Sequence, residues 1–257
     1  MEITWVTFLI VCPMVFLAGF VDSIAGGGGL ISLPAYMLSG LPAHAAVATN
    51  KLSSSVGTFA STIRYIRNKC VDFRLAVPSV IMAVIGAQIG SRLALLVADE
   101  VFKILLLVAL PGIAVWMLTH KNLDPPEDAR VDRKKQMIYV TVASLVIGLY
   151  DGFYGPGTGT FLTLVYTGLC RMKVLKAAGN VKLANLASNL SALLVFLTGG
   201  HVVIALGLTA SVFSIAGNWL GSGVAIRNGS RLVRWVIVAV LALLFVKVIT
   251  DLLVPAA

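Results

Sequence analysis

Long apolar stretches alternate with short polar ones along almost the whole chain. A helix needs about 20 largely apolar residues to cross the hydrocarbon core of a bilayer, and most of the stretches have roughly that length. The pattern therefore predicts an all-α, polytopic membrane protein with about eight to ten helical segments. In the first half of the chain the segments cover residues 3–21, 30–40, 43–66, 75–98 and 104–119.

The segment over residues 30–40 has only about half the length that a spanning helix needs. It follows four consecutive glycines, Gly26–Gly29, and ends before Leu41 and Pro42. Two interpretations fit this length. The segment is either a short full crossing or one arm of a re-entrant hairpin with the glycines at its tip.

The glycine stretch has a copy in the second half of the chain. Glycine loses more backbone entropy on ordering than any other residue, so four in a row inside an apolar region indicate a break in a helix. The stretch begins at Asp22, and a similar glycine-rich stretch begins at Asp151. A lone glycine run favours a tight turn or close helix packing. Two matching runs, each after an Asp and before a short segment, favour a backbone that opens toward a ligand.

The remainder of the second half also repeats the first. At an offset of 129 residues, Gly19, Asp22, Gly26, Gly28 and Leu33 match Gly148, Asp151, Gly155, Gly157 and Leu162. Further along, the offset is 131: Lys51-Leu52 matches Lys182-Leu183, and the Gly86–Gly90 pair matches Gly217–Gly221. This nearly constant offset indicates an internal duplication. The predicted units are a first repeat over residues 1–119, a hydrophilic linker over 120–136 and a second repeat over 137–257.

The basic loops lie at different places in the two repeats. In the first repeat they follow the third segment, over residues 64–74, whereas in the second they occupy residues 171–176 and 227–234. Cytoplasmic loops are enriched in Lys and Arg. The two repeats are therefore predicted to have inverted topology, about five segments each. The linker would be cytoplasmic and both chain termini would lie outside.

The composition supports a membrane protein and argues against other classes. Of 257 residues, 58% are hydrophobic and 12% are charged, which excludes an ordinary water-soluble domain. The net charge of +9 does not predict a nucleic-acid partner, because the charges lie in short clusters between apolar segments. Cys12, Cys70 and Cys170 lack metal-ligand spacing. The sequence predicts no metal, no cofactor and, since hydrolase and nucleotide-binding motifs are missing, no enzyme.

One lysine interrupts the third segment of each repeat. A lysine in the middle of a spanning helix costs about 2.5–3.5 kcal/mol on insertion scales, so it normally faces the inside of the bundle. Lys51 and Lys182 either face the substrate, pair structurally with Asp22 or Asp151, or extend to an interface. Polar residues one and two turns further along give each helix a polar stripe. The stripe residues are Ser54, Ser55 and Thr58 after Lys51, and Asn185 and Asn189 after Lys182.

The breaks and the polar stripes together predict an anion site. The first amides of a helix are unpaired donors at the positive end of its dipole, and they bind anions. Asp22 and Asp151 have two interpretations, as proton-coupling carboxylates or as caps of the glycine loops. The predicted substrate-binding residues are Lys51, Lys182, Gly28, Gly29, Gly157, Thr158, Gly159, Thr49, Asn50, Ser54, Asn180 and Asn185.

These motifs resemble the TauE/SafE-type sulfite exporter family, also described as a group of anion permeases. The resemblance covers nearly the whole chain and implies transport of sulfite, organosulfonates or related small anions, usually outward. Pro156 stands where the first copy has Gly27, so the two loops need not contribute equally. The resemblance rests on residues 18–29, 48–55 and 86–91 and on their copies at 148–160, 180–183 and 217–222.

The sequence thus predicts a secondary transporter that exports a small sulfur-containing anion through the cytoplasmic (inner) membrane by alternating access, with proton coupling as one option. The expected partners are the anion and the lipid bilayer, and a homodimer is left open. Two alternatives remain: a passive anion channel that uses the same lysines, and a non-transporting membrane assembly subunit.

Overall fold

The computed structural model of the protein describes residues 4–98 and 131–253. The predicted segment over 104–119, most of the linker and the chain ends lie outside these residues. The described part is all-helical, which confirms the predicted fold class. Its helices are α1 (Trp5–Ala25), α2 (Gly29–Leu38), α3 (Ala43–Arg67), α4 (Phe73–Leu96), α6 (Arg133–Phe153), α7 (Thr158–Gly168), α8 (Val174–Thr198) and α9 (Ile204–Leu253).

Five of the described helices are long and apolar enough to cross a membrane. They are α1, α4, α6, α8 and the part of α9 over Ile204–Gly229, after which Gly229 adopts a positive φ and interrupts the helical geometry. The helix α3 is equally long, but polar residues lower its hydropathy. Most of them are buried, among them Thr49, Ser53 and Ser61, so the polar side of α3 faces protein and not lipid.

The glycine stretch ends α1 and turns the chain back along it. α1 continues to Ala25, beyond its predicted end at residue 21, because Ser23, Ile24 and Ala25 pack in the core. Gly26 then adopts φ 78°, and its N–H donates to Asp22 O at 2.7 Å, a conformation that glycine takes without steric cost. The 10 residues of α2 rise about 15 Å, half the thickness of the hydrocarbon core. α1 and α2 therefore form a helical hairpin with a short second arm, and α6 and α7 form a similar one. The re-entrant placement of these hairpins in the membrane stays a prediction.

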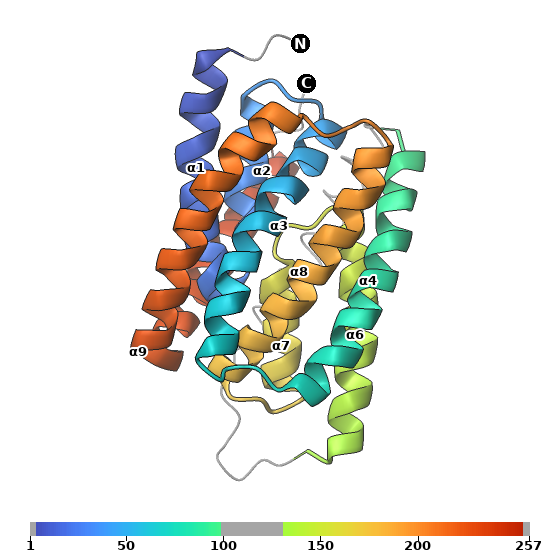
Figure 1. Ribbon diagram of the computed structural model, residues 1–257, viewed down its shortest axis with the longest axis vertical. Helices are drawn as coiled ribbons and strands as arrows, with labels where there is room; N and C mark the ends of the chain where they lie inside the picture. Colours follow the sequence, from blue (N-terminus) through green and yellow to red (C-terminus); the bar gives the residue numbers. More distant parts are fainter. Residues whose placement is uncertain (1–3, 99–130, 254–257) are drawn as a thin grey trace.

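Matched helices of the two repeats run in opposite directions. In Figure 1, α1 and α3 run from top to bottom, whereas α6 and α8 run from bottom to top; likewise α4 runs upward and α9 downward. The orientation of the repeats in the membrane stays a prediction.

The helices sort into two bundles that do not coincide with the two repeats. α9 packs against α1 and α3, whereas α4 packs against α6 and α8. We call α1, α2, α3 and α9 the first bundle, and α4, α6, α7 and α8 the second bundle. Each bundle thus contains one long helix from the other repeat. The two bundles contact each other mainly through α3 and α8.

Paired glycines let helices of different repeats approach closely, as their spacing predicted. A Cβ atom at Gly90 would lie 1.9 Å from Leu149 O on α6, and one at Gly221 would lie 2.3 Å from Phe20 O on α1. These contacts correspond to each other at the offset found in the sequence. They fix α4 against α6 and α9 against α1.

Replacing Gly90 by alanine is expected to lower the temperature of thermal unfolding of the detergent-purified protein. The added methyl group would overlap a backbone carbonyl that cannot move without the whole of α6, and such overpacking costs about 1–3 kcal/mol. Gly168, in the last turn of α7, is the matched control because an added Cβ there meets no atom within 4 Å. Gly168→Ala should leave stability unchanged or raise it by up to about 1 kcal/mol. Equal losses in both variants would contradict this account of the packing.

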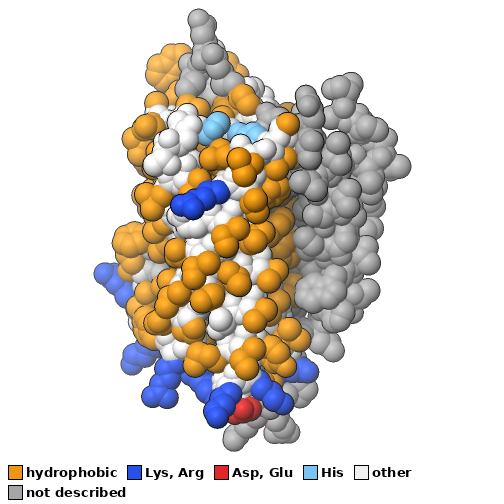
Figure 2. Space-filling model, turned by 90° about the vertical axis from the view of Figure 1, so that its right-hand side faces the viewer, with side chains coloured by type: hydrophobic (Ala, Val, Ile, Leu, Met, Phe, Trp, Pro, Cys, Tyr) orange, Lys and Arg blue, Asp and Glu red, His pale blue; other side chains and the backbone are white. Residues whose placement is uncertain are grey.

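Apolar and basic side chains occupy different parts of the surface along the long axis of the molecule. Figure 2 shows a face that is mostly apolar, with Lys and Arg gathered at its lower end. The turns at that end, between α3 and α4 and between α7 and α8, carry the exposed Arg67, Lys69, Arg74 and Lys173. The first turn of α1 lies at the opposite end. A broad apolar belt that ends in a basic rim is the surface expected of a protein embedded in lipid.

Candidate functional site

The two helix breaks meet inside the protein. A Cβ atom at Gly26 would lie 2.3 Å from the backbone of Gly159, so the two glycine stretches touch without side chains between them. The hydroxyl of Thr160, in the first turn of α7, donates to Ala25 O at 2.8 Å. The C-terminal ends of α1 and α6 and the N-terminal ends of α2 and α7 therefore converge on one region.

One ion pair at this point joins Lys51 of α3 to Asp151 of α6. The Lys51 Nζ atom lies 2.8 Å from Asp151 Oδ1, and both side chains are only 2% exposed. Lys51 also donates to Asn189 Oδ1 at 2.9 Å. The carboxylate accepts two hydroxyl hydrogen bonds, from Thr158 at 2.9 Å and from Ser188 at 2.6 Å. Because both charges are paired and hydrogen-bonded, this ion pair is well compensated for its burial.

A second ion pair joins Lys182 of α8 to Asp22 of α1. The Lys182 Nζ atom lies 2.7 Å from Asp22 Oδ2 and also donates to the backbone oxygen of Asp22. The other carboxylate oxygen, Oδ1, accepts only a long hydrogen bond of 3.4 Å from the Gly28 N–H. The side chain of Asp22 is 15% exposed. This pair is thus less enclosed than the Lys51–Asp151 pair.

Both ion pairs connect the two bundles, and each also connects the two repeats. Lys51 belongs to the first bundle and Asp151 to the second; Lys182 belongs to the second bundle and Asp22 to the first. The sequence left open whether the lysines face a substrate or pair with the aspartates. In this structure they are paired crosswise, each lysine with the aspartate of the other repeat.

A small polar cavity lies beside the Asp22 break. Its volume is about 20 Å³. It brings together four of the predicted substrate-binding residues, Gly28, Gly29, Asn50 and Ser54, with Asp22. Further polar residues that line it are Ser32, Thr58, Ser214 and Asn218.

Four predicted residues of the second repeat lie at the Asp151 break or beside its ion pair. Gly157 adopts φ 81° before the first turn of α7, Gly159 packs on Gly26, and Thr158 binds Asp151. Asn185 Oδ1 accepts a hydrogen bond of 3.4 Å from Asn189, the residue that also binds Lys51. Thr158 directly, and Asn185 through Asn189, therefore support the Lys51–Asp151 pair.

Two predicted residues make contacts away from both ion pairs. The Thr49 hydroxyl accepts the N–H of Val203 at 3.1 Å, just before α9 begins. Asn180 donates to Lys176 O, one turn earlier in its own helix, at 2.8 Å. Their hydrogen bonds hold helix ends and turns, and neither contacts a lysine or aspartate of the ion pairs.

Sequence reasoning missed Ser188 and the two α9 residues Ser214 and Asn218. Ser188 binds Asp151 directly. Ser214 and Asn218 are separated by four positions, so they occupy one face of α9. That spacing was a usable signal, but it does not show that this face of α9 packs on the break after α1.

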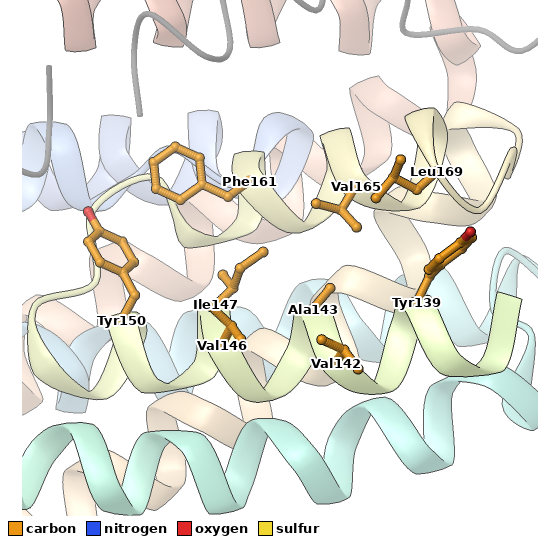
Figure 3. A pocket seen from close by; sticks show the side chains of 9 residues that line it. All are labelled: Tyr139, Val142, Ala143, Val146, Ile147, Tyr150, Phe161, Val165 and Leu169. Atoms are coloured by element: carbon orange, nitrogen blue, oxygen red, sulfur yellow. The ribbon is translucent and has the colours of Figure 1, made fainter. Parts of the chain in front are cut away.

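A larger hollow lies elsewhere and has the wrong chemistry for an anion. It is a groove of about 430 Å³ between α6 and α7, lined by apolar side chains and two tyrosines. Figure 3 shows side chains such as Val146 and Phe161 on either side of it. The Tyr150 hydroxyl is already bound to Pro156 O at 2.7 Å. An anion would lose its hydration there without gaining a charged partner.

The cysteines are packing residues, as the sequence predicted. All three are buried and free. Cys170 lies in the turn after α7, where burial raises the pKa of its thiol to about 12. A thiol with such a pKa is protonated at neutral pH and is a poor nucleophile.

Comparisons with known proteins agree with this architecture. The family model described as sulfite exporter TauE/SafE matches residues 11–248. The probable membrane transporter protein YfcA of Escherichia coli K12 is 36% identical over 235 residues, which cover 91% of this chain and 87% of that protein. The probable membrane transporter protein ORF9 of a Sinorhizobium species is 35% identical over 237 residues, 92% and 90% of the two chains.

A probable membrane transporter protein of Haemophilus influenzae is 32% identical over 239 residues, 92% of each chain. No solved structure matches the chain. The family match covers nearly all of the sequence, both helix breaks and both lysines, which confirms the resemblance read from the motifs. The chain belongs to the sulfite exporter TauE/SafE family of membrane transporters.

Proposed function

We propose that this protein is a secondary transporter that exports a small sulfur-containing anion, such as sulfite or an organosulfonate, across the cytoplasmic membrane by alternating access. The observation that carries the proposal is the pair of crossed ion pairs, Lys51–Asp151 and Lys182–Asp22, which join the two bundles where the helix breaks meet. A structural protein of the membrane needs no such symmetric pair of buried lysines.

The helix breaks offer charged and polar partners for an anion. An oxyanion that approaches Lys182 can replace the Asp22 carboxylate as the partner of the ammonium group. The positive ends of the α2 and α7 dipoles, which lie at the two breaks, would also favour an anion. A carboxylate that loses its lysine is stabilised by taking up a proton. Asp22 and Asp151 are therefore also the places where proton coupling would occur.

The same contacts suggest how access alternates. Because both ion pairs bridge the bundles, a change of partner at either lysine alters the attraction between the bundles. The moving units in this proposal are the two bundles, each with one helix from the other repeat, and not the two halves of the sequence. The basic end of the molecule would face the cytoplasm and the start of α1 the outside, as the positive-inside rule requires.

Lys182→Gln is expected to reduce sulfite transport at least about tenfold in proteoliposomes, because a charge-assisted hydrogen bond worth about 1.5–3 kcal/mol is lost. The wild-type protein should accumulate sulfite against its gradient when a proton gradient is imposed. Lys173→Gln, at an exposed lysine before α8, is the control and should transport like the wild type. Undiminished transport by a folded Lys182→Gln variant would show that Lys182 does not bind the transported anion. Flux that only runs downhill would instead favour a channel.

A further inference from the structure

The small cavity beside the Asp22 break presents acceptor oxygens, and two of its polar atoms have no partner. Asn218 and Thr58 are each 1% exposed. Among the described residues, neither the amide oxygen of Asn218, Oδ1, nor the hydroxyl oxygen of Thr58, Oγ1, has a hydrogen-bond partner. Buried polar atoms are nearly always satisfied, so these two oxygens point to an occupant of the cavity that they line.

The orientation of the Asn218 amide is fixed by its own helix. Its Nδ2 atom donates to Ser214 O at 3.0 Å. A backbone carbonyl only accepts, so the nitrogen of the amide must be on that side. The oxygen of Asn218 is therefore the atom left without a partner, and it is an acceptor.

The hydroxyl groups of two serines at the cavity already donate hydrogen bonds to other protein atoms. Ser32 donates to Gly28 O at 3.2 Å, and Ser54 donates to Asn50 Oδ1 at 3.3 Å. Their oxygens can therefore offer only lone pairs to the cavity. Together with Asp22, whose carboxylate also lines it, the cavity contains one carboxylate and several neutral oxygens, beside the Asn50 amide and the backbone of Gly28 and Gly29. The lysine that neutralises Asp22 is not among its lining residues.

This donor set fits a small monovalent cation better than an anion. Hard cations prefer carboxylate, carbonyl and hydroxyl oxygens, whereas an anion would face the Asp22 carboxylate. A single carboxylate, already paired with Lys182, does not balance a divalent ion. The volume of about 20 Å³ accommodates roughly one water-sized particle, so the several heavy atoms of a sulfite do not fit.

The matching positions in the second repeat lack most of these oxygen-bearing side chains. At the offsets of the duplication, Ser32 corresponds to Phe161, Asn218 to Ala87 and Ser214 to Ala83. Thr58 corresponds to Asn189, whose oxygen is occupied by Lys51. A property that merely followed from a helix break would occur at both breaks. The oxygen-lined cavity belongs to one of them.

We propose that this cavity is a Na⁺ site formed by Asp22, Thr58 and Asn218, with the hydroxyl oxygens of Ser32 and Ser54. The site lies where the C-terminal turns of α1 meet the start of α2, so that opposite ends of two helix dipoles meet there and largely offset each other. It shares Asp22 with the Lys182 ion pair. None of these contacts depends on the identity of the transported anion.

The test is the thermal unfolding of the detergent-purified full chain in NaCl, KCl and choline chloride at equal ionic strength, with no other anion present. At a Na⁺ concentration one hundredfold above Kd, the unfolding temperature of the wild type should rise by about 5 °C or more over choline chloride. KCl should give a clearly smaller rise. Equal unfolding temperatures in all three salts would mean that the cavity holds water, and would overturn the proposal.

Thr58→Val and Thr167→Val form a matched pair of variants. Both threonines are 1% exposed, but Thr167 lies on α7, away from the cavity, and its hydroxyl is bound to Thr163 O at 2.8 Å. Thr58→Val should be as stable as the wild type in choline chloride, because no hydrogen bond is lost, and should lose at least half of the Na⁺ shift. Thr167→Val should keep the full shift.

Asn218→Ala, which also removes the acceptor, should lose the Na⁺ shift as well. A Thr58→Val or Asn218→Ala variant that keeps the full shift would show that Na⁺ binds elsewhere, and would overturn the site. Because no sulfite is present, failure of the Na⁺ site is distinguishable from failure of the proposed anion transport.

Discussion

Replacing Asp151 by asparagine is expected to destabilise the protein by about 3–5 kcal/mol, because Lys51 would become a buried ammonium without a carboxylate. The pair is 2% exposed on both sides, so water cannot take over the lost interaction. In thermal unfolding of the purified protein this corresponds to a decrease of about 6–20 °C. Asparagine keeps the shape of aspartate and one of its two oxygens. The hydroxyl that faces the new NH2 group can donate instead to a backbone carbonyl, Thr158 to Gly155 O or Ser188 to Asn185 O, so the main loss is the charge.

Asp72→Asn is the control for this prediction. Asp72 forms an ion pair of the same length, 2.8 Å, with Arg133, but the two side chains are 22% and 47% exposed. Exposed pairs contribute about 0–1 kcal/mol, so the unfolding temperature should change little.

The double variant Lys51→Met/Asp151→Asn separates the charge from other effects. Removing both charges should recover most of the stability that Asp151→Asn loses. If the double variant were as unstable as the single one, the unpaired ammonium could not be the cause. Transport should nevertheless be abolished in the double variant, because Lys51 is one of the two proposed anion-binding lysines.

Gly26→Ala is the second change with a large expected effect. Gly26 has φ 78°, a conformation that costs an alanine about 1–2 kcal/mol. Its Cβ atom would also lie 2.3 Å from the Cα and C atoms of Gly159, so the two breaks could no longer touch. We expect loss of sulfite transport in proteoliposomes and a decrease in unfolding temperature larger than the backbone strain alone would give.

Gly200→Ala isolates the backbone strain. Gly200 has φ 71°, and an added Cβ meets no atom within 4 Å. This variant should lose only about 1–2 kcal/mol and should transport like the wild type. If Gly26→Ala behaved in the same way as Gly200→Ala, the direct contact between the breaks would not matter for function.

The sequence predicted the local features of this protein because they are encoded in short patterns. The apolar segments, the break at Gly26–Gly29 and the polar stripe after Lys51 follow from helical periodicity and from the entropy of glycine. The short length of the next segment was also predicted, and α2 has 10 residues, Gly29–Leu38.

The crosswise pairing of lysines and aspartates could not be predicted from the same patterns. Lys51 could reach Asp22 or Asp151 as far as the sequence is concerned, and the choice depends on α3 packing against the second bundle. The cavity presents the same difficulty. Asn218 lies far along the chain from Asp22, and only the packing of α9 on α1 brings them together.

The exchange of α4 and α9 between the bundles has a consequence for how the protein is made. Synthesis proceeds from the N-terminus, so the first repeat enters the bilayer while Lys51 and Asp22 still lack their partners on α6 and α8. The second bundle can close once α8 has been inserted, but the first must wait for α9. Neither repeat is therefore an independent folding unit, and a chain released before α9 would leave α1 and α3 in the membrane without the helix that covers them.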